Sequence, residues 1–495
     1  MLFTSSTFFL VFLPIVLAGY FGLGHRSPAA AAAWLFAASV FFYGYWMPAL
    51  TLLLLASITV NFVIGLRIGR SLTARPAAAR VWLVAGVVFN LGLLGYFKYA
   101  NFFVDNLNAV LGSDWSIGRV VLPIGISFYS FTQIAFLVDT WKGKVNEYRG
   151  VHYGLFVTYF PHLVAGPVLH HAQMMPQFAD PAVYRPDAGR LLAGLAIFTI
   201  GLAKKVVLAD GVAPYADAVF HPVDHLGSMP TAPEAWLAAL AYTFQLYFDF
   251  SGYSDMAIGL SWMFNIRLPF NFDSPYKSTS ITEFWRRWHI SLSTFLRDYL
   301  YIALGGNRKG PFRRYLNLAA TMVLGGLWHG ASWSFVLWGA LHGAYLVANH
   351  GFRALCERLG WAERLSGHRG AAAAAWALTF LCVVLAWVFF RAQTLDGAVR
   401  VLSAMVSFDS LAAPQVLLWN AGLSLQTGLG WCALLAAVAL LGPNSNLIGE
   451  RLLRSLAASR PRRPLVGGAV VLCACALVVL NAARDTASAF IYFNF

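Results

Sequence analysis

The 495-residue sequence is poor in charge and in paired cysteines. Only 11% of its residues are charged, less than half of the roughly 25% usual for a soluble domain. This composition excludes an ordinary soluble enzyme. The five cysteines lie mostly in or beside apolar runs, without the spacing of a zinc site or a disulfide framework. We interpret them as small hydrophobic residues.

Acidic residues are scarce relative to basic ones, 21 against 35, which gives a net charge of +14. Because 59% of the chain is hydrophobic, this excess is better explained by orientation in a bilayer than by nucleic-acid binding. We therefore expect membrane lipids, and no nucleic acid, as partners. No basic residue precedes Arg26, so the first apolar run lacks the charged start of a cleaved signal peptide. We expect it to be retained as a helix.

Apolar runs are what the sequence has in quantity. A transmembrane helix needs about 20 mostly apolar residues. Runs that reach or approach this length occupy 3–23, 29–64, 81–99, 120–138, 191–209, 235–262, 332–349, 372–390, 428–442 and 465–483. Residues 29–64 suffice for two spans, divided at Trp46-Met47-Pro48 because proline interrupts a helix. The pattern predicts an all-α polytopic membrane protein of about 11–12 spans in a single domain, 1–495.

The distribution of charge between the runs predicts their orientation, since lysine and arginine collect on the cytoplasmic side. Segments 65–80 and 450–464 are rich in arginine, and loop 264–314 holds nine basic residues against three acids. Segment 210–234 holds four acids and no basic residue. We expect the first three to be cytoplasmic, and 210–234 and the N-terminus to be periplasmic.

These signs alternate correctly only if the run containing Phe160-Pro161-His162-Leu163-Val164-Ala165-Gly166-Pro167 enters the membrane and returns on the same side. Re-entrant backbone is tolerated only where protein or water covers it. The segment is therefore expected to line a cavity.

The 264–314 loop carries an aromatic and basic pattern. Ser280 and Glu283 form a capping box, which predicts a helix beginning there. Trp285, Trp288 and Leu292 fall on one helical face, as in a helix that lies at the membrane interface. This helix either anchors the loop or helps to bind a cytosolic, phosphate-bearing substrate. The candidate phosphate-binding residues are Lys277, Arg286, Arg287, Arg297, Arg308 and Lys309.

His329 is expected to lie within the membrane. Only 14 residues, Tyr315 to Trp328, separate it from Arg314. As a helix they rise about 21 Å, against a hydrocarbon core of about 30 Å. An ionisable residue at that depth is a candidate functional residue, although a lone histidine in an apolar helix is also commonly a hydrogen-bonded core residue.

Two carboxylates, Asp249 and Asp255, fall inside the apolar run 235–262 and should have partners, because burying them unpaired is costly. They would either fix a histidine tautomer or hold the helix bundle together. Three further histidines, His162, His170 and His171, have no acidic or cysteine neighbour at ligand spacing. We predict no metal site.

Several ordered motifs resemble the membrane-bound O-acyltransferase (MBOAT) superfamily. They are Leu268-Pro269-Phe270-Asn271-Phe272 with Pro275-Tyr276, then Phe284-Trp285-Arg286-Arg287-Trp288-His289-Ile290-Ser291-Leu292-Ser293, and Leu327-Trp328-His329-Gly330. Within it, 159–167 and the C-terminal 490–495 are similar to the bacterial alginate O-acetyltransferases and their polysaccharide- and peptidoglycan-acetylating relatives. The motif-bearing core is about 120–350, with peripheral helices in 1–119 and 351–495.

The resemblance implies a helical bundle around a central channel and an acyl transfer from a thioester to a hydroxyl. His329 would be catalytic, His289 a second candidate, and Asn271, Tyr276, Trp328, Asp249 and Asp255 supporting residues. Such a transfer needs a base with a pKa near neutrality and donors for the oxyanion. No permanently bound cofactor is implied.

By the same resemblance, the expected activity is acetyl transfer at the bacterial inner membrane. The donor would be cytosolic and acetyl-CoA-like, and the acceptor an exported polysaccharide such as alginate, reached directly or through a periplasmic acetyltransferase partner. A lipid or teichoic-acid acyltransferase of the same superfamily is one alternative. A membrane transporter with Asp249, Asp255 and His329 in its substrate path is another, and it predicts repeated halves that the sequence does not show.

Overall fold

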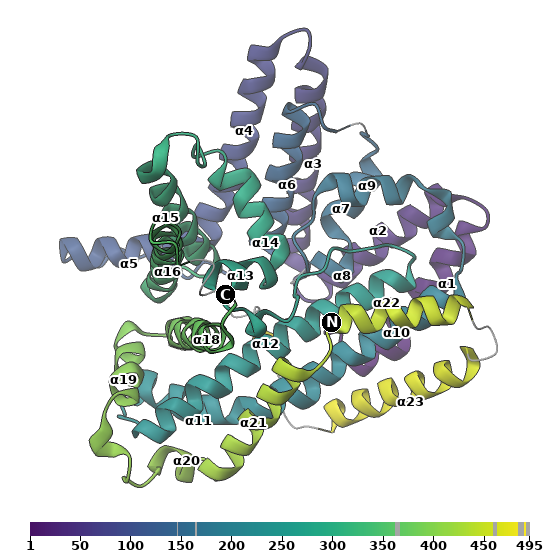
Figure 1. Ribbon diagram of the computed structural model, residues 1–495. Helices are drawn as coiled ribbons and strands as arrows, with labels where there is room; N and C mark the ends of the chain where they lie inside the picture. Colours follow the sequence, from purple (N-terminus) through teal and green to yellow (C-terminus); the bar gives the residue numbers. More distant parts are fainter. Residues whose placement is uncertain (146, 164–165, 362–366, 459–462, 484–489, 492–495) are drawn as a thin grey trace. The chain divides into compact units, whose positions relative to one another are not determined.

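The computed structural model describes residues 1–145, 147–163, 166–361, 367–458, 463–483 and 490–491. Every regular element in this part of the chain is a helix (Figure 1). The chain forms two compact units. Unit 1 holds Met1–Leu202, Tyr253–Phe270 and the described chain from Ser445 onward, and unit 2 holds Ala203–Gly252 and Asn271–Asn444. Helix α12 (Ala232–Met263) begins in unit 2 and ends in unit 1.

Membrane-spanning helices are present as predicted. Among the described residues, six helices are long and apolar enough to cross a membrane, or seven if one broken pair counts as a span. The six are Thr7–Gly24, Pro48–Ser71, Pro76–Leu111, Ala188–Leu226, Arg369–Arg391 and Pro464–Ala482. This confirms an all-α polytopic membrane protein with six or more spans. The full number of about 11–12 stays a prediction.

Unit 1 contains the N-terminal helices and two C-terminal ones. The predicted break at Trp46-Met47-Pro48 is confirmed, because α2 ends at Gly44 and Pro48 starts α3. The elements are η1 (Thr7–Phe12), α1 (Leu13–Gly24), α2 (Pro28–Gly44), α3 (Pro48–Ser71), α4 (Pro76–Leu94), η2 (Gly95–Tyr99), α5 (Ala100–Leu111), α6 (Ile126–Trp141), α7 (Gly150–Thr158), α8 (Phe160–Leu163), α9 (His171–Ala179), η3 (Pro181–Tyr184), α10 (Ala188–Ala203), α22 (Ser445–Ala458) and α23 (Arg463–Ala482).

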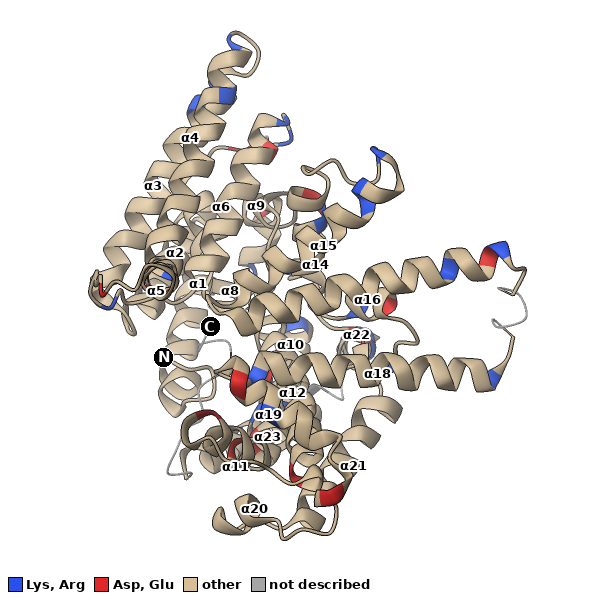
Figure 2. Cartoon of the chain, turned by 90° about the vertical axis from the view of Figure 1, so that its left-hand side faces the viewer, with Lys and Arg blue, Asp and Glu red and all other residues tan. Residues whose placement is uncertain are grey.

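Helices α3, α4 and α6 pack together in unit 1. A buried amide pair joins two of them: Asn90 Nδ2 donates to Asn61 Oδ1 at 2.6 Å, and Asn61 Nδ2 donates to Asn90 Oδ1 at 3.3 Å. Such pairs provide hydrogen-bond partners for polar side chains that are buried between apolar helices. Lysine and arginine gather where α3 turns into α4, as Figure 2 shows, in the segment expected to be cytoplasmic.

The segment predicted to be re-entrant is interrupted. Helix α7 ends at Thr158 and the four-residue α8 follows, with all of its residues buried. Val164 and Ala165 lie outside the described residues, so the return of this segment to the same membrane side stays a prediction.

Unit 2 contains the predicted catalytic motifs. Its elements are η4 (Lys204–Ala209), α11 (Asp210–Leu226), the start of α12, η5 (Pro275–Lys277), α13 (Ile281–Arg287), α14 (Ile290–Phe295), η6 (Leu296–Tyr301), α15 (Gly310–His329), α16 (Trp333–Arg358), α18 (Arg369–Arg391), α19 (Leu395–Met405), η7 (Phe408–Ser410), α20 (Val416–Asn420) and α21 (Leu425–Leu441). Helices α15 and α16 pack closely. A Cβ at Gly326 of α15 would overlap the carbonyl oxygen of Phe335 in α16, so this approach requires glycine.

Two predictions about local structure are wrong. The span predicted to end near residue 209 continues without a break as α11, because the acidic residues of α11 have partners. Asp217 pairs with Arg391 at 2.7 Å, and Asp224 accepts from the backbone amides of Gln393 and Thr394, just before α19. The acidic segment 210–226 is therefore a helix and not a loop.

The predicted interfacial helix is also shorter than expected. Ser280 caps it, accepting from the Glu283 amide at 3.2 Å, but the helix ends at Arg287. His289 takes a left-handed conformation with φ 44°, and a second short helix follows. Trp288 is only 2% and Leu292 only 1% exposed. These side chains therefore belong to the protein core, and they do not form a membrane-facing stripe.

Candidate active site

The two predicted histidines both lie in unit 2. His289 follows α13, and His329 is the last residue of α15. The indole of Trp328 contacts both imidazoles, with ring centroids 6.4 Å from His289 and 4.9 Å from His329. Folding therefore joins two motifs that are 40 residues apart in the sequence through one aromatic ring.

His289 is held in place by Asn271, which the sequence motifs indicate as a supporting residue. The Asn271 Oδ1 oxygen accepts from the backbone amide of Ser291 at 3.2 Å and from its hydroxyl at 2.8 Å. The same oxygen lies 3.2 Å from His289 Nδ1. Because this oxygen can only accept, Nδ1 carries the proton and Nε2 is the basic nitrogen of the neutral imidazole.

The environment of His289 keeps it neutral. The residue is completely buried, and the ring of Phe250 packs against its imidazole at 4.7 Å. Burial lowers the pKa of His289 to about 3, since the charged form loses its hydration. His289 can thus accept a proton at Nε2, but it is a weaker base than one whose pKa lies near neutrality.

His329 lies in an aromatic enclosure. It is 4% exposed, and its imidazole contacts Trp328, Trp338 and Phe390. A Cβ at the next residue, Gly330, would overlap the ring of Phe335, so the backbone here must be glycine. The end of α15 is thereby held against α16, which fixes the position of the imidazole.

The other supporting residues have structural partners. The Tyr276 hydroxyl donates to the Thr243 carbonyl at 2.6 Å. Asp249 lies 2.6 Å from Lys205 Nζ, which is also 2.8 Å from Asp210. These carboxylates therefore have the partner that their burial requires.

Asp255 lies in unit 1, where it accepts from Ser445 at 3.0 Å. Of the three further histidines, His162 Nε2 lies 3.0 Å from the Phe156 carbonyl, and His171 Nδ1 lies 3.2 Å from Asp139. Among the described residues, no group of three or more His, Cys, Asp or Glu is arranged to hold a metal ion.

The six candidate phosphate-binding residues differ in their surroundings. Arg287 pairs with Glu283 at 2.9 Å and Asp273 at 3.6 Å, and Lys277 donates to the Gly442 carbonyl. Arg297 pairs with its neighbour Asp298. Arg286 is exposed, as are Arg308 and Lys309 in the basic turn before α15, visible in Figure 2.

Arg286 belongs to a basic cluster that the sequence analysis did not assemble. Burial and the guanidinium groups of Arg314, Arg353 and Arg286 all lower the pKa of His350. Arg314 Nη2 also lies 3.5 Å from His350 Nδ1. The basic cluster, Arg286, Arg314, Arg353 and His350, thus gathers side chains from α13, α15 and α16.

Two further residues escaped the sequence analysis. Lys205 interrupts the apolar run 191–209 and forms the ion pairs with Asp249 and Asp210; a lysine inside such a run is itself a signal. His342 accepts from Trp285 Nε1 at 3.3 Å and contacts Trp338. It occurs in no recognisable motif, so only the packing of α16 reveals it.

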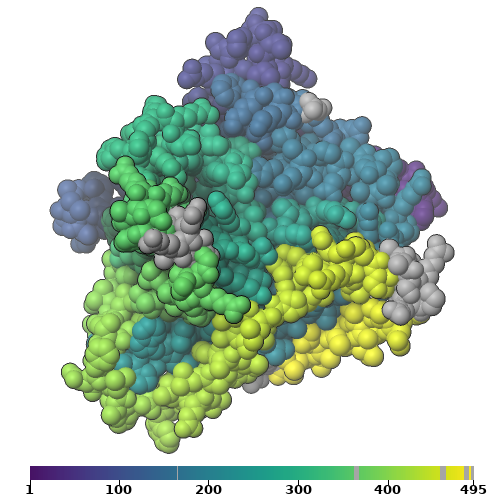
Figure 3. Space-filling model, viewed as in Figure 1, coloured from purple at the N-terminus to yellow at the C-terminus, as the bar shows by residue number. Residues whose placement is uncertain are grey.

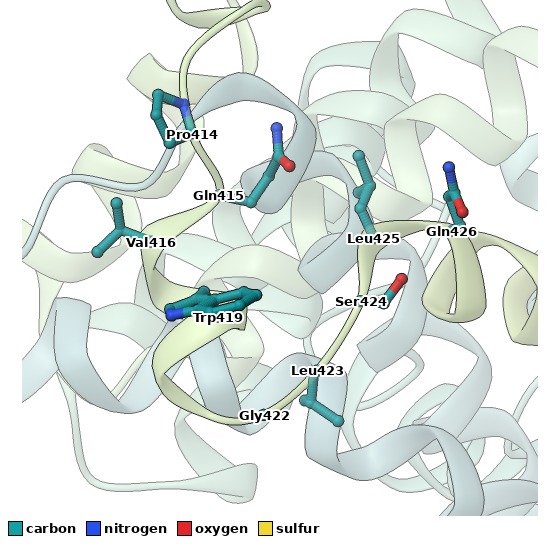
Figure 4. Close-up of a pocket in the computed structure, with 9 residues that line it drawn as sticks. All are labelled: Pro414, Gln415, Val416, Trp419, Gly422, Leu423, Ser424, Leu425 and Gln426. Atoms are coloured by element: carbon teal, nitrogen blue, oxygen red, sulfur yellow. The ribbon is translucent and has the colours of Figure 1, made fainter.

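One hollow in unit 2 does not carry acid–base chemistry. It has a volume of about 850 Å³ and lies beside α20, where side chains of α19 to α21 form part of the surface in Figure 3. Its lining contains no ionisable side chain (Figure 4): Pro414, Gln415, Val416, Trp419, Gly422, Leu423, Ser424, Leu425 and Gln426.

Comparison with known proteins indicates a family for this chain. Residues 144–386 match the model of the membrane-bound O-acyltransferase family. The peptidoglycan O-acetyltransferase of Helicobacter pylori is 42% identical over 83% of this chain and 81% of its own. The probable alginate O-acetylase AlgI of Azotobacter vinelandii is 47% identical, covering 82% and 78%. That of Pseudomonas aeruginosa is 46% identical, covering 83% and 76%.

Proposed function

Because the chain belongs to the membrane-bound O-acyltransferase family and is a membrane O-acetyltransferase, we propose that it moves acetyl groups from cytosolic acetyl-CoA to an exported polysaccharide. The relatives described above are named as a peptidoglycan O-acetyltransferase and as probable alginate O-acetylases. The observation that carries the proposal is the pair of buried histidines joined through Trp328. The acceptor is either the polymer itself or a periplasmic acetyltransferase partner.

In the proposed reaction, His329 removes the proton of the acceptor hydroxyl as its oxygen attacks the thioester carbonyl. A carbon–oxygen bond forms and the carbonyl electrons move onto its oxygen. The intermediate then expels the CoA thiolate, which takes the proton from His329. His289, with Nε2 as its acceptor atom, assists this proton transfer.

The proposed donor site is the basic cluster at the ends of α13, α15 and α16. Three arginines around one histidine suit the phosphates of an acyl-CoA, since guanidinium groups form paired hydrogen bonds to phosphate. Lys277, Arg287 and Arg297 are already paired within the protein, whereas Arg308 and Lys309 lie exposed near the start of α15. The basic charge of loop 264–314 favours a cytoplasmic orientation, which supports this cluster as the donor site.

The test uses purified protein in liposomes with radiolabelled acetyl-CoA inside or outside and a polysaccharide acceptor. The wild type should release CoA and form acetyl esters, and His329→Ala should lose both while unfolding at the wild-type temperature. His368→Ala is the matched control, because His368 is exposed before α18. Wild-type ester formation by His329→Ala would refute the site. Transport of acceptor with an intact thioester would indicate a transporter.

A further inference from the structure

Helix α16 places Trp338 beside His329, and His342 lies beside Trp338. Trp338 and His342 are one helical turn apart, so they share a face of the helix. The Trp338 ring lies 5.2 Å from the His329 ring and 4.9 Å from the His342 ring. The two residues are 1% and 0% exposed.

Both side chains present a buried N–H group. His342 Nδ1 accepts from Trp285 Nε1 at 3.3 Å, so the single proton of its neutral imidazole sits on Nε2. The indole of Trp338 is always a donor. Within the described part of the chain, neither His342 Nε2 nor Trp338 Nε1 has a hydrogen-bond partner.

A buried hydrogen-bond donor without an acceptor destabilises the folded protein. Each costs about 1–3 kcal/mol, and folded proteins leave few of them without a reason. Two other indoles of unit 2 do have acceptors among the described residues. Trp236 Nε1 donates to the Met405 carbonyl at 2.8 Å, and Trp376 Nε1 to the Tyr276 carbonyl at 2.9 Å. The two unsatisfied donors on this face of α16 therefore call for an acceptor that the described residues do not provide.

We propose that Trp338 Nε1–H and His342 Nε2–H bind the carbonyl oxygen of the acyl group during transfer. This inference rests on the proposed function, in which His329 acts at that carbonyl. When the hydroxyl oxygen attacks, the carbonyl π electrons move onto the oxygen and the two N–H groups stabilise its negative charge. As the carbon–sulfur bond breaks, the electrons return to form the ester carbonyl, and the thiolate takes the proton from His329.

The burial of Trp338 and His342 favours stabilisation of an oxyanion, because water is excluded from both donors. Preorganised donors in a water-excluded pocket stabilise a developing oxyanion more strongly than a neutral carbonyl, and each is worth about 100- to 1000-fold in kcat. Phe284 stacks on His342 at 6.2 Å, so aromatic rings hold the donor in place. Trp285 is a positioning residue, because its indole fixes the tautomer that puts the proton on Nε2.

The deciding variant is Trp338→Phe, which removes the N–H and keeps an aromatic ring. We expect kcat to fall about 100-fold, with donor KM within about twofold of wild type. The unfolding temperature should stay equal or rise, since the indole N–H has no acceptor among the described residues. Trp236→Phe is the matched control: it removes a bonded indole, so it should lower the unfolding temperature and leave kcat unchanged.

A spectroscopic measurement separates this role from packing. With carbonyl-13C acetyl-CoA bound to His329→Ala protein, which keeps the thioester intact, the carbonyl stretch should shift to lower frequency. Adding Trp338→Phe, or Trp285→Phe, should reverse part of that shift. Wild-type kcat in Trp338→Phe, a loss of kcat that follows lost folding, or an unchanged stretch would overturn the proposal and leave a buried water as the acceptor. A wild-type protein that never releases CoA would instead refute the proposed function.

Discussion

At the scale of single residues, His289 shows how the fold sets the chemistry of a side chain. A left-handed backbone is uncommon for a histidine, yet His289 has φ 44°, and Asn271 accepts from Ser291 on the same strained turn. Strain of this kind clusters at functional sites, where surrounding contacts maintain it. Here those contacts orient Nε2 and exclude water from it.

The stability of the protein should depend on pH through His289. Its pKa is about 3 when folded and about 6.5 when unfolded. Between these values the unfolded chain binds a proton that the folded chain does not, so stability falls as pH decreases below 6.5. At pH 5 the loss is about 2 kcal/mol. Denaturant unfolding at pH 7.5 and 5 should show a smaller difference for His289→Gln, and equal differences in both proteins would contradict the assignment.

The buried ion pairs of Lys205 lead to a second prediction. Lys205→Met removes the cation shared by Asp249 and Asp210, and should destabilise the protein by about 3–5 kcal/mol. Asp249→Asn should cost less, because an amide oxygen still accepts from Lys205 and Asp210 remains. Thermal unfolding in detergent measures both. A Lys205→Met protein as stable as Asp249→Asn would show that the lysine is not the shared partner.

At the scale of elements, the close packing of α15 and α16 positions the site. A Cβ at Gly339 would overlap the Met322 carbonyl oxygen, so Gly339→Ala must push the helices apart. We expect a cost of about 1–3 kcal/mol and lower kcat, since Trp338 precedes this residue. Gly351→Ala in the same helix meets no atom within 4 Å, and should raise stability slightly. Equal activity in the two variants would contradict this reasoning.

The basic cluster allows a matched comparison of neighbouring arginines. Arg314→Ala and Arg286→Ala should raise the KM for acetyl-CoA several-fold more than they lower kcat, because they remove charge from the proposed donor site. Arg287→Ala should mainly reduce stability, since Arg287 already pairs with Glu283 and Asp273. Steady-state kinetics in liposomes measure the difference. An effect on KM confined to Arg287→Ala would place the phosphates elsewhere.

At the scale of the whole molecule, the charge of the connecting turns predicts the topology. Thr73 and Met229 are both exposed, the first between α3 and α4 and the second between α11 and α12. In a cysteine-free background, Thr73→Cys should react with a membrane-impermeant maleimide only from the cytoplasmic side. Met229→Cys should react only from the periplasmic side. Labelling of both from one side would reject the proposed orientation.

The sequence by itself determined the class of the protein and its candidate histidines. Long apolar runs leave only a helical membrane fold, because a bilayer offers no partner for unpaired backbone groups. The motifs around His289 and His329 sufficed to indicate acyl transfer, and the family comparisons agree. The break before Pro48 was also predictable, because it depends on a local backbone restriction.

Tertiary structure decided what depends on contacts between distant residues. Periodicity could not show that α13 ends before His289, since that turn is held by Asn271 from 18 residues earlier. Spacing did not reveal that Lys205 pairs with Asp249, that Arg286, Arg314 and Arg353 all act on His350, or that His342 contacts Trp338. Local sequence indicates most of the helices, but the ends of some helices, the pairing of charges and the orientation of hydrogen-bond donors arise only when those helices pack.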